Sequence, residues 1–385
     1  MLGSETQKNM QAASFSKKIL GHYPELVKAL FLVKKAAALT NRETGAIEEA
    51  HAARLISVID DINQRLLNMP HHERNECFAV DVFAGGGSIG IHLNISEYLM
   101  LASGVPLHII NKSQSTADVC HTAFRIAIIR SWKRLAVVLD KVVEELTSKS
   151  IQFHHVQTLG RTCLQDASSI SVGNSLSATP AALERRKRQA EGLIGSLHEL
   201  ALGGTVMGNG DGACAFYQEK ILHNLARVSD LPIIARKNRY EAAQYSDDVG
   251  AIVSELSHIA LIMMKLARDV RLLSSGPQGG FGELSIPKVH EGSSFYKDKN
   301  NPIVPETVLQ CGFLVLGAHH ATQCALLHAE LQLNIFDNAV CINALDCMEW
   351  LTQSLTLFES HCIRDIAVNS ERCRDLAQRT TATKF

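Results

Sequence analysis

The residues best suited to chemistry in this sequence lie in one polar stretch, residues 292–302. Two adjacent serines come first, then two lysines, and then two asparagines that a proline follows. A serine such as Ser293 can accept a proton if its surroundings lower its pKa, and Lys299 and Asn301 together could hold a carboxylate. This set of side chains indicates either proton abstraction next to a carboxylate or a solvated surface turn.

The backbone of this stretch is expected to form a loop. Because a proline disfavours helical backbone at the residue before it, Asn301 should be extended or in a turn. The stretch also lies between two long apolar segments, residues 248–273 and 304–333. A polar loop between such segments is a suitable place for a mobile lid that carries catalytic groups.

The elements that must position these side chains are long helices. Apolar residues recur at three- and four-residue spacing along residues 248–273, which predicts a helix of roughly 37 Å at ~1.5 Å per residue. No alternation of apolar and polar residues is strong enough to indicate a sheet. We therefore predict an all-α fold with a long central helix bundle, in which Cys324 packs as a core residue. Further helices are expected over residues 24–39, 44–67, 120–146, 168–202 (with a kink at Pro180), 304–333 and 340–366.

Composition narrows the class of protein. The chain is 46% hydrophobic and carries a net charge of -1, so it can bury a large core, and it offers no electrostatic case for nucleic acid or membrane partners. The basic run at 184–188 has no interleaved aromatics and is expected to be a solvated face. No apolar run approaches the ~20 residues of a membrane span. Ten scattered cysteines and a polar start predict free thiols in a cytoplasmic protein.

Residues 292–302 resemble the signature loop of the aspartase/fumarase superfamily, Gly-Ser-Ser-x-Met-Pro-x-Lys-x-Asn-Pro. Tyr296 and Lys297 replace the Met-Pro pair, which adds bulk and a charge to the loop. The flanking residues 271–277 and 304–306 resemble the aspartate ammonia-lyase branch in particular. The resemblance extends over nearly the whole chain, from about Thr6 to Cys373.

A second motif, residues 108–118, is similar to the family's His-x-Asn-x-Ser-Gln-Ser-Thr/Ser-Asn-Asp. Ser115 and Thr116 stand at the positions that bind substrate carboxylate in the family, whereas Ala117 replaces an asparagine and His121 a proline. The same pattern is a common helix start, with a capping hydroxyl before an apolar helix. Both interpretations are compatible, because helix N-termini bind anions.

A third motif, residues 160–167, resembles Gly-Arg-Thr-His-Leu-Gln-Asp-Ala. Thr162 is retained, but Cys163 stands where the family has a histidine that helps to bind the substrate. Two interpretations of this thiol remain open. It is either a nucleophile with a lowered pKa or a buried, unreactive side chain.

The glycine-rich residues 83–90 admit two interpretations as well. A phosphate-binding loop is one, although no Lys-Ser/Thr pair follows the glycines. The other is the family's Gly-Thr-Ser-x-Asn-Met-Asn-x-Asn-Glu segment, which contacts substrate carboxylate. In that alignment Ile89 and Gly90 replace the Thr-Ser pair, and His92 replaces the first asparagine.

The resemblance implies a domain organisation and an assembly. It implies a shortened N-terminal helical domain at 1–75, a central long-helix bundle at 76–335 and a small C-terminal helical domain at 336–385. It further implies a homotetramer, with active sites that three chains share, a small dicarboxylate substrate and no cofactor.

The resemblance also implies a mechanism. Ser293 would be the catalytic base, Lys299 and Asn301 would hold a carboxylate, and Ser115, Thr116 and Thr162 would complete the binding site, with His92 and Cys163 at substrate-facing positions. The leading hypothesis is a carbon–nitrogen lyase of the aspartate ammonia-lyase type. Because several substrate-facing residues differ from the family, two alternatives stay open: a C–N or C–O lyase acting on a modified succinate, and a catalytically inactive tetrameric scaffold.

Overall fold

The computed structural model describes residues 2–379, and most of these residues are helical. Residue 1 and residues 380–385, which the two predicted terminal domains include, lie outside the described residues. The predicted all-α class is confirmed, since the strands form only three short two-stranded sheets in the described part of the chain. In chain order the elements are α1 (Ser4–Ala13), η1 (Leu20–His22), α2 (Pro24–Glu43), α3 (Glu49–Arg65), η2 (Leu66–Asn68), α4 (His71–Cys77), α5 (Ile89–Ser103), α6 (Leu107–Ile110), α7 (Thr116–Gln152), β1 (Gln157–Thr162), β2 (Gln165–Ser171), α8 (Val172–Ser196), β3 (Glu199–Leu200), α9 (Ala215–Ser229), β4 (Ile234–Ala235), α10 (Arg239–Gln244), α11 (Asp247–Leu273), β5 (Leu284–Ser285), α12 (Ile303–Leu327), α13 (Asp337–Phe358), η3 (Glu359–Ile363), β6 (Ala367–Val368) and α14 (Ser370–Arg379).

The chain forms two compact units, and each unit is assembled from separate parts of the sequence. The first unit combines the chain up to Trp132 with Gly192–Val253 and His319–Asp346. The second combines Lys133–Glu191, Ser254–Ala318 and the chain from Cys347 onward. The sequence-based division at residues 75 and 335 stays a prediction.

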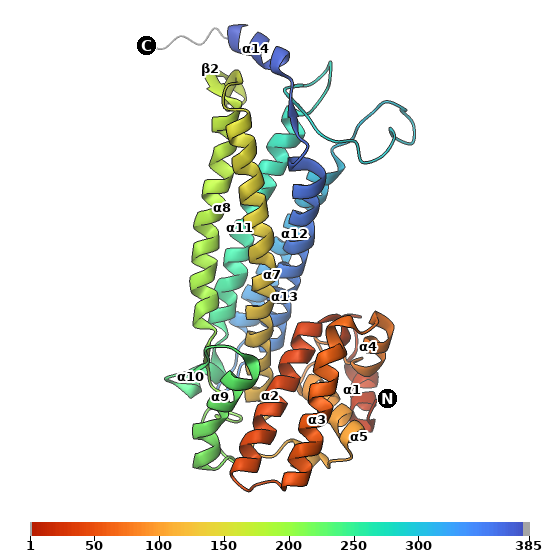
Figure 1. Cartoon of the computed structure of the whole chain (residues 1–385), viewed down its shortest axis with the longest axis vertical. Helices are drawn as coiled ribbons and strands as arrows, with labels where there is room; N and C mark the ends of the chain where they lie inside the picture. Colours follow the sequence, from red (N-terminus) through yellow and green to blue (C-terminus); the bar gives the residue numbers. More distant parts are fainter. Residues whose placement is uncertain (1, 380–385) are drawn as a thin grey trace. The chain divides into compact units, whose positions relative to one another are not determined.

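In the first unit, α2 is the central element, and it packs against α3, α5 and α9 (Figure 1). The helix begins at Pro24, a position where proline is tolerated because first-turn amides have no partner within the helix. Buried residues follow on nearly all sides of α2, as expected for a helix surrounded by others. One of these buried residues is a lysine, Lys34, which is only 3% exposed.

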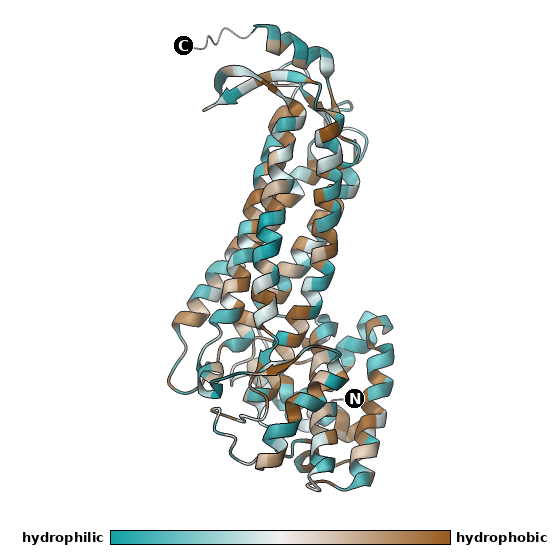
Figure 2. Ribbon diagram, turned by 60° about the vertical axis from the view of Figure 1, so that its left-hand side comes forward, coloured by the Kyte–Doolittle hydropathy of each residue, from teal (hydrophilic) through white to brown (hydrophobic). Residues whose placement is uncertain are grey.

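The second unit contains parts of the five long helices α7, α8, α11, α12 and α13, which run alongside one another (Figure 1). Apolar and polar residues are mixed along the long helices (Figure 2). The side chains of Ile259, Met263 and Leu266 on α11 are almost fully buried, which agrees with their three- to four-residue spacing. Helix α8 continues through Pro180, and it begins at Val172 rather than at the predicted residue 168.

A hairpin that the sequence pattern did not predict precedes α8. Strand β1 pairs with β2 in antiparallel register, from Gln157 opposite Ser171 to Thr162 opposite Gln165. Cys163 and Leu164 form the turn, with φ of 53° and 58°. Both angles lie in the left-handed region, which two-residue hairpin turns with a suitable twist require.

Two further expectations need correction. Cys324 is exposed, not a core residue. Helix α11 is long and apolar enough to cross a membrane by length and composition alone, which the search for apolar runs overlooked, and 67% of its most apolar window is buried inside the protein. That degree of burial is also typical of a core helix.

Candidate active site

A hydrogen-bonded series of buried and half-buried polar side chains in the first unit links α2, α5 and the start of α7. His92 Nδ1 lies 2.8 Å from Thr116 Oγ1, and His92 Nε2 lies 2.6 Å from Lys34 Nζ. Lys34 Nζ also donates to Asn111 Oδ1 at 2.6 Å, and Ser96 Oγ donates to the same oxygen at 2.9 Å. The structure therefore brings two predicted site residues, His92 and Thr116, into direct contact.

The buried surroundings shift Lys34 and His92, the two titratable groups of this hydrogen-bonded series, toward their neutral forms. Burial lowers the pKa of Lys34 to about 7, although Cys120 and Asp118 act in the opposite direction. Burial also lowers the pKa of His92 well below its usual value, and the neighbouring Lys34 lowers it further. His92 is therefore a neutral imidazole at neutral pH, whereas Lys34 is divided between its charged and neutral forms.

Ser115, the next predicted residue, is positioned through the buried carboxylate of Asp118. The Ser115 N–H donates to Asp118 Oδ1 at 3.0 Å. The N–H groups of Gly203 and Thr205 donate to the other carboxylate oxygen at 3.0 and 3.1 Å. Asp118 thereby ties the first turn of α7 to the loop that precedes α9. Burial raises the pKa of Asp118, and the three N–H donors oppose that shift.

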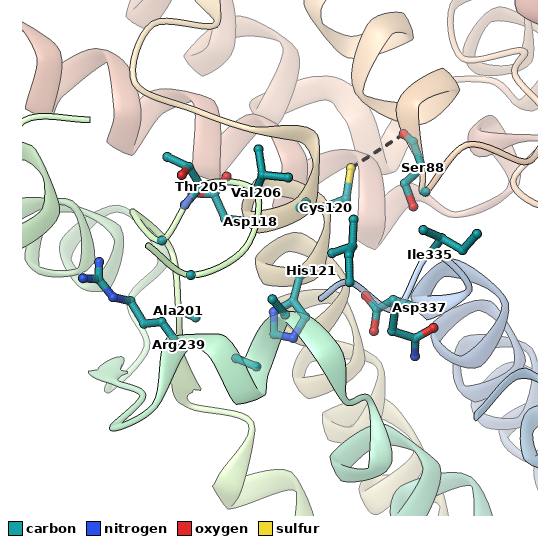
Figure 3. A pocket seen from close by; sticks show the side chains of 18 of the residues that line it. Ser88, Asp118, Cys120, His121, Ala201, Thr205, Val206, Arg239, Ile335 and Asp337 are labelled. Atoms are coloured by element: carbon teal, nitrogen blue, oxygen red, sulfur yellow. Dashed lines mark hydrogen bonds between the residues drawn. The ribbon is translucent and has the colours of Figure 1, made fainter. Parts of the chain in front are cut away.

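A cavity of about 40 Å³ lies next to this turn, and Figure 3 shows the side chains around it. Ala117 and His121, one helical turn apart on α7, both line it. The His121 Nε2 atom is buried and has no hydrogen-bond partner within the described residues. Burial, with a contribution from Arg125, lowers the pKa of His121 to about 4. A neutral imidazole with a free nitrogen therefore faces a space large enough for a few atoms.

A buried ion-pair cluster includes Asp337, one of the residues that line the cavity. Arg125, which is fully buried, donates to both carboxylate oxygens of Asp248 at 2.8 and 3.0 Å and to Asp337 at 3.3 Å. Although burial acts in the opposite direction, Arg125 holds the pKa of Asp248 at about 2, below its ordinary value. Asp337 also accepts a hydrogen bond from Ser246 Oγ at 2.6 Å. This cluster joins the N-terminal parts of α7, α11 and α13 in a fixed geometry.

The remaining predicted residues belong to the second unit, and most of them are exposed. Thr162 and Cys163 lie at the β1–β2 turn, and both side chains are exposed. The interpretation of Cys163 as a buried thiol is therefore wrong for this chain, because the turn projects it outward. Arg161, just before the turn, forms an ion pair with Glu283 at 2.7 Å.

Ser293 lies in the loop between β5 and α12, as the proline after Asn301 and the apolar segments on both sides predicted. Its Oγ accepts the N–H of Tyr296 at 2.8 Å and that of Phe295 at 3.4 Å, and it donates to the Tyr296 carbonyl at 3.1 Å. Lys299 is exposed and Asn301 is half-buried. The oxygen of Ser293 is thus already surrounded by backbone donors from its own turn.

The sequence analysis missed Lys34 as a site residue. The signal was present, since Lys34 follows Leu30 and precedes Ala38 by four residues on the apolar side of its helix. A lysine on a buried helical face is rarely tolerated without a partner. That partner, His92, lies 58 positions away in the sequence, and only the fold joins the two.

Comparison with known proteins agrees with the fold and the motifs. The model of a family described as lyase matches residues 3–317. The aspartate ammonia-lyase of Pseudomonas aeruginosa is 34% identical over 380 residues, covering 93% of this chain and 77% of the relative. The aspartate ammonia-lyase of Pseudomonas canavaninivorans is 33% identical over 377 residues, with the same coverage of each chain.

Solved structures show the same architecture. A crystal structure titled fumarate lyase:delta crystallin, from Brucella melitensis and bound to cobalt, is 33% identical, with a TM-score of 0.92 over 98% of this chain and 84% of that chain. A class II fumarase from Schistosoma mansoni is 24% identical with a TM-score of 0.90, covers 97% of this chain and 83% of its own, and supports the fold alone.

The fold and the three motifs thus define an all-α enzyme built on long helices. The chain belongs to this lyase family, within the aspartase/fumarase superfamily. The resemblance noted in the sequence is confirmed, and so is the expectation that the protein is a lyase.

Proposed function

We propose that this protein is a carbon–nitrogen lyase of the aspartate ammonia-lyase type. It removes an amine from aspartate or a substituted succinate by anti elimination and forms fumarate. The identity to aspartate ammonia-lyases over 93% of the chain supports this reaction class. We also propose a homotetramer in which residues of three chains make up each active site.

In this mechanism Ser293 Oγ takes the proton from the carbon next to one carboxylate. The electron pair of that C–H bond forms the double bond, the C–N bond breaks, and the amine leaves with its electron pair. Negative charge builds on the carboxylate beside the forming double bond, where fixed donors must already stand. Lys299 and Asn301 hold this carboxylate, and Ser115, Thr116 and Thr162 bind the remaining oxygens.

One observation carries the assignment of the base. The N–H groups of Tyr296 and Phe295 point at Ser293 Oγ, at 2.8 and 3.4 Å. Donors to an oxygen favour its deprotonated form, whereas the Tyr296 carbonyl that accepts the Ser293 proton at 3.1 Å favours the protonated form. The two N–H groups lower the cost of an alkoxide once substrate binding turns the hydroxyl away from that carbonyl. A serine in an ordinary turn without such donors would stay protonated at neutral pH and would be a poor base.

The matching experiment is a comparison of two neighbouring serines. Fumarate release is followed by ultraviolet absorbance, first with L-aspartate and then with a panel of substituted succinates. Ser293→Ala is expected to lower kcat by about 10²–10⁴-fold, the usual contribution of a general base. Ser294→Ala, an exposed serine beside it, is the control and should retain activity. Retained turnover in Ser293→Ala contradicts the assignment.

The shared site is tested by mixing two inactive variants. Thr116→Ala removes a contact in the first unit, and Ser293→Ala removes the base in the second. If sites combine residues from different chains, refolding the two variants together restores part of the activity, because some mixed tetramers contain an intact site. Each variant refolded alone stays inactive. No recovery in the mixture contradicts a shared site.

A second candidate, a lyase acting on a modified succinate, is favoured by the cavity that Ala117 and His121 line. Ala117 leaves space there, and His121 offers an unpartnered nitrogen to a substituent. This candidate predicts that a substituted succinate reacts faster than aspartate. Turnover of neither compound class would favour the third possibility, a tetrameric homologue without activity.

A further inference from the structure

The buried pair Lys34 and His92 takes no part in the elimination proposed above, yet it contacts a residue that does. Lys34 is 3% exposed and His92 is 7% exposed, so neither side chain is placed to touch a substrate. His92 Nδ1 nevertheless lies 2.8 Å from the hydroxyl of Thr116, and Lys34 lies 2.6 Å from the opposite ring nitrogen. A neutral imidazole carries a single ring proton, so the bond at one nitrogen decides the role of the other.

With Lys34 charged, the direction of every hydrogen bond in the chain is fixed. An ammonium group has only donors, so His92 Nε2 accepts and the ring proton sits on Nδ1. Nδ1–H then donates to Thr116 Oγ1. Because this oxygen is already an acceptor, the hydroxyl proton of Thr116 is free to point at a carboxylate oxygen.

With Lys34 neutral, the donor and acceptor roles in these hydrogen bonds can reverse. The amine nitrogen now offers a lone pair, and the ring proton can move to Nε2 and donate to it. His92 Nδ1 becomes an acceptor and takes the hydroxyl proton of Thr116. A carboxylate then meets the lone pairs of that oxygen instead of its proton, which is repulsive.

We infer that Lys34 and His92 are positioning residues that turn the Thr116 hydroxyl toward the substrate, so that a dicarboxylate binds best when Lys34 carries its proton. This inference rests on the proposed function, since it takes Thr116 as a carboxylate contact. Binding then takes up a proton at Lys34, and by reciprocity a rise in pH weakens binding.

The pH at which this happens follows from the surroundings of Lys34. Burial lowers its pKa to about 7. The titratable groups that act on it are His92 from α5 and Asp118 and Cys120 from α7, and Tyr217 from α9 stands near Asp118. Burial raises the pKa of both the Cys120 thiol and the Tyr217 phenol, so these groups stay neutral in this range. The affinity should therefore begin to fall close to pH 7.

The test measures binding of succinate, an unreactive dicarboxylate, by calorimetry between pH 6.5 and 8.5. The wild-type Kd is expected to rise about 20-fold across this range if a single proton is taken up on binding. His92→Asn and Lys34→Met should both remove the pH dependence. Lys34→Arg, which stays charged, should bind tightly at every pH. The matched control is Lys35→Met, because Lys35 is the next residue and pairs with Asp60 instead; it should keep the wild-type slope.

The outcomes separate this inference from the proposed function. If succinate binds to the wild type with a pH-independent Kd, or if His92→Asn keeps the slope, the inference is overturned while the proposed function stands. If the wild type neither binds succinate nor converts any compound of the panel, both are overturned. Circular dichroism of each variant checks folding, and His92→Asn and Lys34→Arg decide the question should Lys34→Met fail to fold.

Discussion

His92 and Thr116 in the first unit and Ser293 and Lys299 in the second are held in contrasting ways. The first pair belongs to a continuous chain of hydrogen bonds that runs through three helices. Ser293 bonds to its own turn, and Lys299 is exposed to solvent. The proposed carboxylate contacts of the first unit are thus held by side chains from several helices, whereas the proposed base is held by the backbone of its own turn.

The largest expected effect is on stability, and it comes from replacing Arg125 in the first unit. Arg125→Leu removes the closest cation from the buried carboxylates of Asp248 and Asp337 and leaves Asp248 with only the longer ion pair to Arg236 at 3.4 Å, which should lower the free energy of unfolding by about 3–5 kcal/mol. The control is Arg271→Leu, which removes an exposed ion pair with Glu306 in the second unit and should change stability by about 1 kcal/mol or less. Urea denaturation of both variants measures the difference. Similar losses in the two would show that the first unit is not held by its buried charges.

In the second unit, replacing Lys299 and Lys297 one at a time tests the proposed carboxylate contact. Lys299→Met removes the proposed carboxylate contact. The change in kcat/KM should correspond to a loss of about 1.5–3 kcal/mol, the contribution of a hydrogen bond to a charged group. Lys297→Met makes the same change of charge two positions away, in a residue that the family motif lacks. Steady-state kinetics compare them, and an equal effect of both would mean that the loop acts only through its overall charge.

The burial of Lys34 in the first unit should also make the free energy of unfolding depend on pH. Its pKa is about 7 in the folded protein, against 10.5 for an ordinary lysine, so the unfolded chain binds more protons between these values. Stability attributable to this group therefore rises with pH, by about 1.6 kcal/mol in total between pH 7.0 and 8.5, because the slope grows toward about 1.4 kcal/mol per pH unit as Lys34 loses its proton in the folded protein. In Lys34→Met this rise is absent, whereas Lys35→Met retains it. Urea titrations at pH 7.0, 7.75 and 8.5 measure it, and identical slopes in wild type and Lys34→Met would refute the lowered pKa.

The smallest effect concerns accessibility at Cys163. A thiol reagent in the folded protein should react quickly with Cys163, Cys214 and Cys324, which are exposed, and slowly with the six buried cysteines. Cys163→Ala should remove one quickly reacting thiol and leave the fold intact. Unchanged labelling in that variant would place Cys163 under cover, for instance beneath another chain of the assembly.

Much of the helical architecture follows from periodicity. Helix α11 was expected at 248–273 and runs from Asp247 to Leu273, because its apolar residues cover several faces and a glycine and a proline follow it. The hairpin before α8 was not predicted because its strands are short and their buried residues do not alternate with exposed ones, so no apolar alternation marks them. Its turn is built from two residues that are not glycine or asparagine, so the usual turn signal is also missing.

The candidate site could be predicted only in part, for a related reason. Motif order could nominate Ser115, Thr116 and Ser293, because each lies in a short contiguous pattern, and their roles stay predictions. Lys34 and His92 become partners only when α2 packs against α5, which sequence spacing does not encode. The exposure of Cys163 likewise depends on the backbone of its turn, and the residue type alone suggested the opposite.

That turn has a consequence for engineering. The backbone at Cys163 has a left-handed conformation, which is unfavourable for a side chain such as cysteine. The antiparallel pairing of the flanking strands maintains this conformation. The side chain points outward and packs against no core, so its replacement costs little. A saturation library at this single codon would therefore vary polarity, size and nucleophilicity on a constant scaffold, and asparagine, which tolerates this geometry, should emerge as the most stable member.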